Sequence, residues 1–131
     1  MGLFDKLKKK TETSENQLFV FDKAEECYVA TINSIRFECD DLEEISEEYI
    51  QELADAYQTK VETIAEHIMD DIKDFYEDIT VEELVDALGA PIIRPDVGVI
   101  TYIEHSLDDC HIIDVEFDGI FDPLTYVTID G

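Results

Sequence analysis

Residues 46–75 read SEEYIQELADAYQTKVETIAEHIMDDIKDF, with apolar side chains at steps of three and four positions. Because an α-helix completes a turn every 3.6 residues, this spacing places them in one stripe. The stripe contains Ile50, Leu53, Tyr57, Val61, Ile64, Ile68, Ile72 and Phe75. Ser46 is suited to cap the first turn, with Ile45 and Ile50 as its hydrophobic staple. The segment therefore predicts one long helix with a single apolar face that is buried against the rest of the protein.

A second, shorter helix is expected over residues 80–88, because both of its ends carry residues with strong positional preferences. Thr80 and Glu83 match a capping box, in which each side chain bonds the backbone amide of the other residue. Gly89 favours a C-terminal cap, and Pro91 cannot continue the helix. This helix is therefore predicted to be short and sharply bounded.

The segments on either side of the helices change to an apolar period of two, which is typical of β-strands. We expect strands at residues 18–22, 28–32, 35–39, 92–93, 99–105, 110–117 and 124–129. Asn33 and Ser34, between the second and third of these, are suited to a tight hairpin turn. When the strands 99–105 and 110–117 are paired around a four-residue turn, Ile100 and Tyr102 share a face with the apolar residues of the partner strand.

The element order βββ-αα-ββββ with short connections predicts an α+β fold. We expect one antiparallel sheet with the long and the short helix packed on one face. Residues 1–17 are polar without a regular period, apart from a short amphipathic tip at residues 2–8, and are expected to form a flexible tail. Residues 18–131 are then a single domain of ordinary size.

The net charge of the chain is −25, from 34 acidic and 9 basic residues. Residues 1–10 contain four lysines and one aspartate, so residues 11–131 carry a net charge of −28. A negative field of this size repels nucleic acid and anionic membranes and attracts basic proteins. We therefore expect a basic protein partner and no binding to nucleic acid.

The chain has three cysteines in no C-x-x-C spacing, which are Cys27, Cys39 and Cys110. This pattern, without a secretory signal in the first ten residues, is typical of reduced thiols in the cytoplasm. No apolar run approaches the ~20 residues of a membrane helix. The tip at residues 2–8 offers only a weak membrane anchor. We expect a cytoplasmic protein without stable membrane insertion.

Reactive side chains cluster only in the predicted hairpin at residues 104–111. In the expected register Glu104 faces His111 as a cross-strand polar pair, and His105 faces Cys110 on the other side of the sheet. His105, Asp108 and Cys110 are the candidate metal ligands, because imidazole, carboxylate and thiolate are ligands of transition metals. Against a metal, no second ligand cluster occurs elsewhere in the sequence to complete the site. The sequence therefore leads us to expect no cofactor and no catalytic residue.

A dense acidic run precedes and begins the long helix, and it is the candidate surface for a basic partner. It does not have the spacing of an EF-hand calcium loop. Part of it is explained by the helix dipole, which favours acidic residues in the first turn. The candidate partner-binding residues are Asp40, Asp41, Glu43, Glu44, Glu47 and Glu48.

From Leu18 onward the chain resembles a family of small acidic bacterial proteins catalogued only as a domain of unknown function. The resemblance lies in the strand meander, the long central helix and a closing hairpin that begins VITYIEH at residues 99–105 and returns as HII at residues 111–113. The opening MGLFDKL at residues 1–7 is similar to a common bacterial start. The resemblance implies a bacterial, cytoplasmic protein and no particular activity.

Small acidic domains of this general kind recur among immunity proteins that neutralise secreted toxins, which is an analogy at the level of the fold. The leading hypothesis is therefore a non-catalytic, immunity-like binding module for a basic partner. One alternative is a metal-dependent or small-molecule enzyme centred on the hairpin at 104–111. A second alternative is a DNA mimic, which requires carboxylates at phosphate-like intervals along one face.

Overall fold

The computed structural model describes residues 18–130 with the exception of residues 44, 74–75, 77–78 and 109. The predicted flexible tail at residues 1–17, with its amphipathic tip, lies outside the described residues. The end of the predicted helical stripe, Phe75, lies outside them as well.

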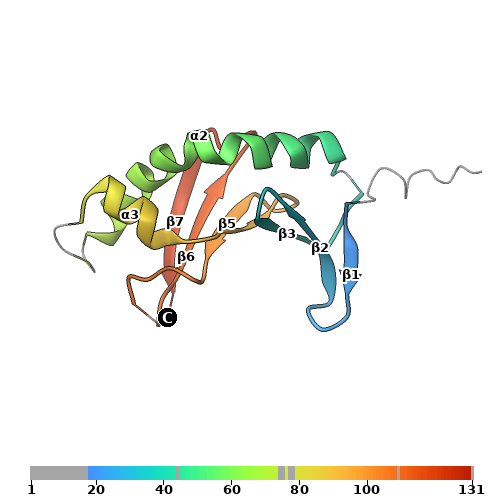
Figure 1. The fold of residues 1–131 in the computed structure, drawn as a ribbon, viewed down its shortest axis with the longest axis horizontal. Helices are drawn as coiled ribbons and strands as arrows, with labels where there is room; N and C mark the ends of the chain where they lie inside the picture. The colour runs from blue at the N-terminus through green and yellow to red at the C-terminus, as the bar shows by residue number, and fades with distance from the viewer. Residues whose placement is uncertain (1–17, 44, 74–75, 77–78, 109, 131) are drawn as a thin grey trace, which may run out of the picture.

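Seven strands form one sheet whose spatial order follows the order of the chain (Figure 1). The strands are β1 (Val20–Asp22), β2 (Cys27–Ile32), β3 (Ile35–Cys39), β4 (Ile92–Arg94), β5 (Val99–Tyr102), β6 (Ile112–Phe117) and β7 (Leu124–Asp130). Asn33 and Ser34 turn the chain between β2 and β3 with φ angles of 55° and 66°. Positive φ at both central residues is the geometry of a two-residue hairpin turn. The predicted α+β fold and element order are confirmed.

The described residues form two helices, α2 (Glu47–Ile72) and α3 (Val81–Leu88). Ser46 caps α2 by accepting a hydrogen bond from the backbone amide of Tyr49 at 3.1 Å. Thr80 and Glu83 form the predicted capping box at the start of α3. Within the described part of the chain, neither helix combines the length and the apolar character that crossing a membrane requires.

Helix α2 lies across one face of the sheet, and α3 packs beside it (Figure 1). The expected register of the β5–β6 hairpin is confirmed, because Ile100 pairs with Val115 and Tyr102 with Ile113. All four side chains are fully buried beneath the helices. The hydroxyl groups of Tyr57 on α2 and Tyr102 on β5 lie 2.6 Å apart within this core. The apolar stripe of α2 and one face of the sheet thus form a single core.

The sheet differs from the expected purely antiparallel arrangement at one place, because β3 and β4 are parallel. Their connection contains both helices, which carry the chain across the face of the sheet and back to the end where β3 began. Parallel neighbours need such a crossover, whereas a hairpin produces antiparallel ones. As a result, the carboxyl ends of β3 and β4 lie at the same end of the sheet.

The β5–β6 hairpin is also shorter than predicted, since β5 ends at Tyr102 and β6 begins at Ile112. The intervening loop lies against the C-terminal end of α3. The backbone amide of Ser106 in the loop donates a hydrogen bond to the carbonyl of Ala87 at 2.8 Å. The predicted strand pairing of Glu104 with His111 is therefore wrong, because both residues lie in the loop. The hydrogen bond from Ser106 to Ala87 holds this segment against the end of α3.

Candidate functional site

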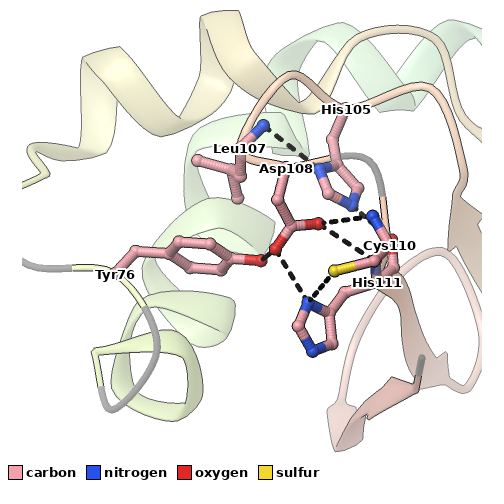
Figure 2. Close-up of polar contacts among 6 residues, drawn as sticks. All are labelled: Tyr76, His105, Leu107, Asp108, Cys110 and His111. Atoms are coloured by element: carbon pink, nitrogen blue, oxygen red, sulfur yellow. Dashed lines mark hydrogen bonds and ion pairs between the residues drawn. The ribbon is translucent and has the colours of Figure 1, made fainter.

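The β5–β6 loop is held from within by the buried side chain of His105 (Figure 2). The backbone amide of Leu107 donates to Nδ1 of His105 at 3.2 Å, so this ring nitrogen is unprotonated. The proton of the neutral ring is then on Nε2, which donates to the carbonyl of His111 at 2.6 Å. Both ring nitrogens are used to shape the loop, which makes His105 a structural residue.

Asp108 is the hub of the loop, and its two carboxylate oxygens have separate roles (Figure 2). Oδ1 accepts the backbone amides of Cys110 and His111 at 3.1 and 3.0 Å. Oδ2 accepts the hydroxyl of Tyr76 and the Nδ1 proton of His111, the latter at 2.7 Å. The hydrogen bonds from Tyr76 and from His111 hold the pKa of the Asp108 carboxyl well below its usual range. Asp108 is therefore a carboxylate in the folded protein at neutral pH.

Cys110 brings an exposed thiol to the same point, with Sγ 3.4 Å from Nδ1 of His111. The structure thus brings together Asp108 and Cys110 from the predicted metal set, but it places His111 beside them in place of His105. A nucleophilic triad uses one ring nitrogen for the nucleophile and the other for the carboxylate. Here both groups approach the same nitrogen, so the arrangement is a convergence of ligand atoms and not a proton relay.

The second candidate site is an acidic groove of about 610 Å³ at the carboxyl ends of β3 and β4. Its floor and walls combine apolar and acidic side chains, and Val97 among them is 65% exposed. A groove with an apolar surface between carboxylates fits the stem and head of lysine or arginine. We call this site the acidic groove. It is lined by Asp40, Asp41, Glu43, Ile45, Tyr49, Pro95, Asp96 and Val97.

Asp96 fixes the shape of the acidic groove. Its Oδ2 accepts hydrogen bonds from the backbone amides of Asp40 at 2.9 Å and of Asp41 at 3.3 Å. The side chain of Asp41 in turn accepts the backbone amide of Glu43 at 2.9 Å. The loop after β3 is therefore tied to the turn after β4. This contact depends on the parallel pairing, which places both strand ends at one edge.

The structure divides the predicted partner-binding residues into two groups. Asp40, Asp41 and Glu43 line the acidic groove. Glu47 and Glu48 lie in the first turn of α2 and are not among the lining residues, in agreement with the favourable position of acids at a helix N-terminus. Glu44 lies outside the described residues.

Among the described residues that line the acidic groove there is no lysine or arginine. Arg94, which comes just before the turn of Asp96, instead contacts Glu38 at 3.5 Å. Arg36 contacts the other oxygen of Glu38 at 2.6 Å. Both arginines thus form ion pairs with Glu38 on the sheet.

The three cysteines lie in the described part of the chain and form no disulfide. Burial is the main cause that raises the pKa of Cys39 to about 12, and the carboxylate of Asp96 adds to it. Burial also raises the pKa of Cys27. Both buried thiols are therefore protonated at neutral pH and behave as small core residues.

Among the residues of these sites that reasoning from the sequence did not identify are Asp96, His111 and Tyr76. The stretch Pro95-Asp96-Val97-Gly98 has the composition of a turn, but composition does not reveal which loop lies beside it. His111 was assigned to a strand facing Glu104, and Tyr76 lies between the two predicted helices. Only the docking of the loop against α3 brings Tyr76 and His111 to the same carboxylate.

No protein-family model matches the chain, and comparisons with curated proteins and with solved structures found no match either. The resemblance to a family of small acidic bacterial proteins therefore stays a prediction.

Proposed function

We propose that the protein is a non-catalytic binding module that docks a basic segment of a partner protein in the acidic groove. The observation that carries the proposal is the combination of four carboxylates with an exposed apolar surface, with no basic side chain among the described lining residues. A lysine or arginine entering the groove would place its stem on Val97 and Tyr49 and its charge among the carboxylates.

The charge of the whole chain supports the same partner class. A net charge of −28 over residues 11–131 attracts a basic protein from a distance and raises the association rate. An immunity-type inhibitor that neutralises a basic toxin is one protein of this class. The three free thiols are typical of a reducing compartment, and we place this function in the bacterial cytoplasm.

The experiment measures the binding of a fluorescent lysine- and arginine-rich peptide by anisotropy at low and high salt. The groove variant carries Asp41→Asn and Glu43→Gln. The control variant carries Glu52→Gln and Glu62→Gln, which removes the same charge from exposed positions of α2. Each exposed ion pair contributes ~0.2–1 kcal/mol, so we expect about 2- to 30-fold weaker binding for the groove variant alone.

Equal weakening in the groove variant and the control variant would show that binding follows net charge without a defined site. The same two variants can then be used as baits for the natural partner. A partner retained by the control variant, lost by the groove variant and released by salt is the expected result. A partner that binds both variants equally and resists salt would contradict the proposal.

A further inference from the structure

We propose that Asp108, Cys110 and His111 form a binding site for one divalent ion of the zinc class, in the loop between β5 and β6. One ligand atom from each residue lies within 4.8 Å of the other two. Figure 2 shows these three side chains turned toward one another, with Tyr76 approaching from the opposite side. The cluster lies apart from the acidic groove and shares no residue with it.

The distances within the cluster are close to those of a metal site. Zinc bonds of roughly 2.0–2.3 Å in tetrahedral geometry place neighbouring ligand atoms about 3.3–3.6 Å apart. Sγ of Cys110 and Nδ1 of His111 already lie 3.4 Å apart. Oδ2 of Asp108 lies 2.7 Å from the same nitrogen, because a proton now joins them. An ion that replaces this proton needs the carboxylate to withdraw by only about 0.6 Å.

The loop backbone holds these ligands through atoms other than the ligand atoms, and Oδ2 of Asp108 in addition accepts the hydroxyl of Tyr76. Oδ1 of Asp108 is bonded to the backbone amides of Cys110 and His111, which leaves Oδ2 directed at the cluster. His105 holds the carbonyl of His111 from the buried side of the loop. Partners of this kind orient metal ligands and reduce the reorganisation that binding requires.

The chemistry of the donors selects the class of ion. A thiolate, an imidazole and a carboxylate together favour zinc or cobalt, whereas calcium and magnesium prefer oxygen ligands alone. Cys110 is exposed, so solvent reaches the cluster and a water molecule completes the fourth position.

Binding also has a defined proton balance. The thiol of Cys110 loses its proton when sulfur bonds the ion. The proton on Nδ1 of His111 moves to Nε2, so that Nδ1 becomes the ligand. The thiol proton therefore goes to solvent when an ion binds, and the ring proton of His111 stays on the ring.

The test uses the full chain, stripped of metal with a chelator and titrated with Co²⁺ and with Zn²⁺. We expect one equivalent of Co²⁺ to give a thiolate-to-cobalt charge-transfer band in the near ultraviolet. We expect Zn²⁺ to displace the bound Co²⁺ and so to abolish the band. Zn²⁺ binding to the metal-free protein should release one proton and protect Cys110 from a thiol reagent. Circular dichroism reports whether each variant described below is folded.

Three variants remove one ligand each. Cys110→Ser and His111→Ala should lose the charge-transfer band and bind Zn²⁺ at least about ten-fold more weakly. Asp108→Asn keeps an oxygen for the backbone amides of the loop and removes the charged ligand, so it should weaken binding without unfolding the loop. Glu62→Gln is the charge-matched control, and we expect it to bind Zn²⁺ like the unmodified chain.

Two results would overturn the proposal. One is Zn²⁺ binding that is unchanged in Cys110→Ser and His111→Ala, because the ion would then be held by the acidic surface. The other is a cobalt spectrum without a sulfur band in the unmodified chain. Neither result depends on the peptide-binding experiment, so this inference and the proposed function fail separately.

Discussion

The carboxylate of Asp96 accepts a hydrogen bond from the backbone amide of Asp40 at 2.9 Å, although 56 positions separate the two residues in the chain. Asp96 follows β4 and Asp40 follows β3, and these strands are the only parallel neighbours in the described sheet. A single side chain thus joins the two loops that form the acidic groove.

Replacing Asp96 with alanine should loosen the loop after β3. The backbone amides of Asp40 and Asp41 would exchange a charged acceptor for water, and both are exposed, so we expect a loss of about 1 kcal/mol in the free energy of unfolding. Urea denaturation measures this loss, and hydrogen exchange should show faster exchange at both amides. The control Asp96→Asn keeps an acceptor oxygen and should recover part of the protection. Unchanged exchange in Asp96→Ala would show that the loop is held by other contacts.

Replacing Tyr102 with phenylalanine should cost more than replacing both tyrosines of the buried pair. The single change leaves the hydroxyl of Tyr57 without this partner in the core, which costs about 1–3 kcal/mol. The double variant with Tyr57→Phe removes both polar groups and should be more stable than the single variant. Chemical denaturation of the set completes a double-mutant cycle. Strictly additive losses would show that the two hydroxyls do not interact.

The same pair predicts how stability responds to alkaline pH. Burial raises the pKa of Tyr57 from 10.0 to about 12, and burial also raises the pKa of Tyr102. Unfolded tyrosines lose their protons first, so the contribution of this pair to the free energy of unfolding should be constant below about pH 10 and should fall as pH rises toward 12. The double phenylalanine variant should lose less stability over this range in denaturation curves. An equal decline in both proteins would assign the effect to other groups.

The three cysteines should differ strongly in reactivity. In the native protein we expect one thiol, that of Cys110, to react quickly with a chromogenic disulfide reagent, because it is exposed. Cys39 is buried and its pKa is raised to about 12, and burial likewise raises the pKa of Cys27. Both should react only after unfolding, since the thiolate is the reactive form. Rapid loss of all three thiols without denaturant would contradict the structure.

Removing the cap of α3 should destabilise the protein measurably. In Thr80→Ala the capping box is lost, which costs about 1 kcal/mol of the free energy of unfolding. Thr80→Ser keeps the hydroxyl and serves as the matched control. Because the β5–β6 loop bonds to the end of α3 at Ala87, hydrogen exchange at Ser106 should also rise in Thr80→Ala. Equal stability of the alanine and serine variants would show that the cap has no role.

Local patterns in the sequence are enough to predict the helices, the strands and the turns between them. The stripe from Ile50 to Ile72 has the helical period, and the capping box at Thr80 and the turn at Asn33 are formed by neighbouring residues. The register of the β5–β6 hairpin was predictable too, because a shift of one residue would turn its apolar side chains away from the core.

The sites required more than local patterns. Asp40 and Asp96 meet because β3 and β4 run parallel, and no interaction near either residue specifies which strands become neighbours across a helical crossover. His111 replaces His105 in the cluster because the loop docks on α3 and turns His105 inward. Helices, caps and turns depend on interactions between residues a few positions apart, so they can be predicted from the amino-acid sequence. Contacts between distant loops depend on how whole elements pack, and they exist only in the folded protein.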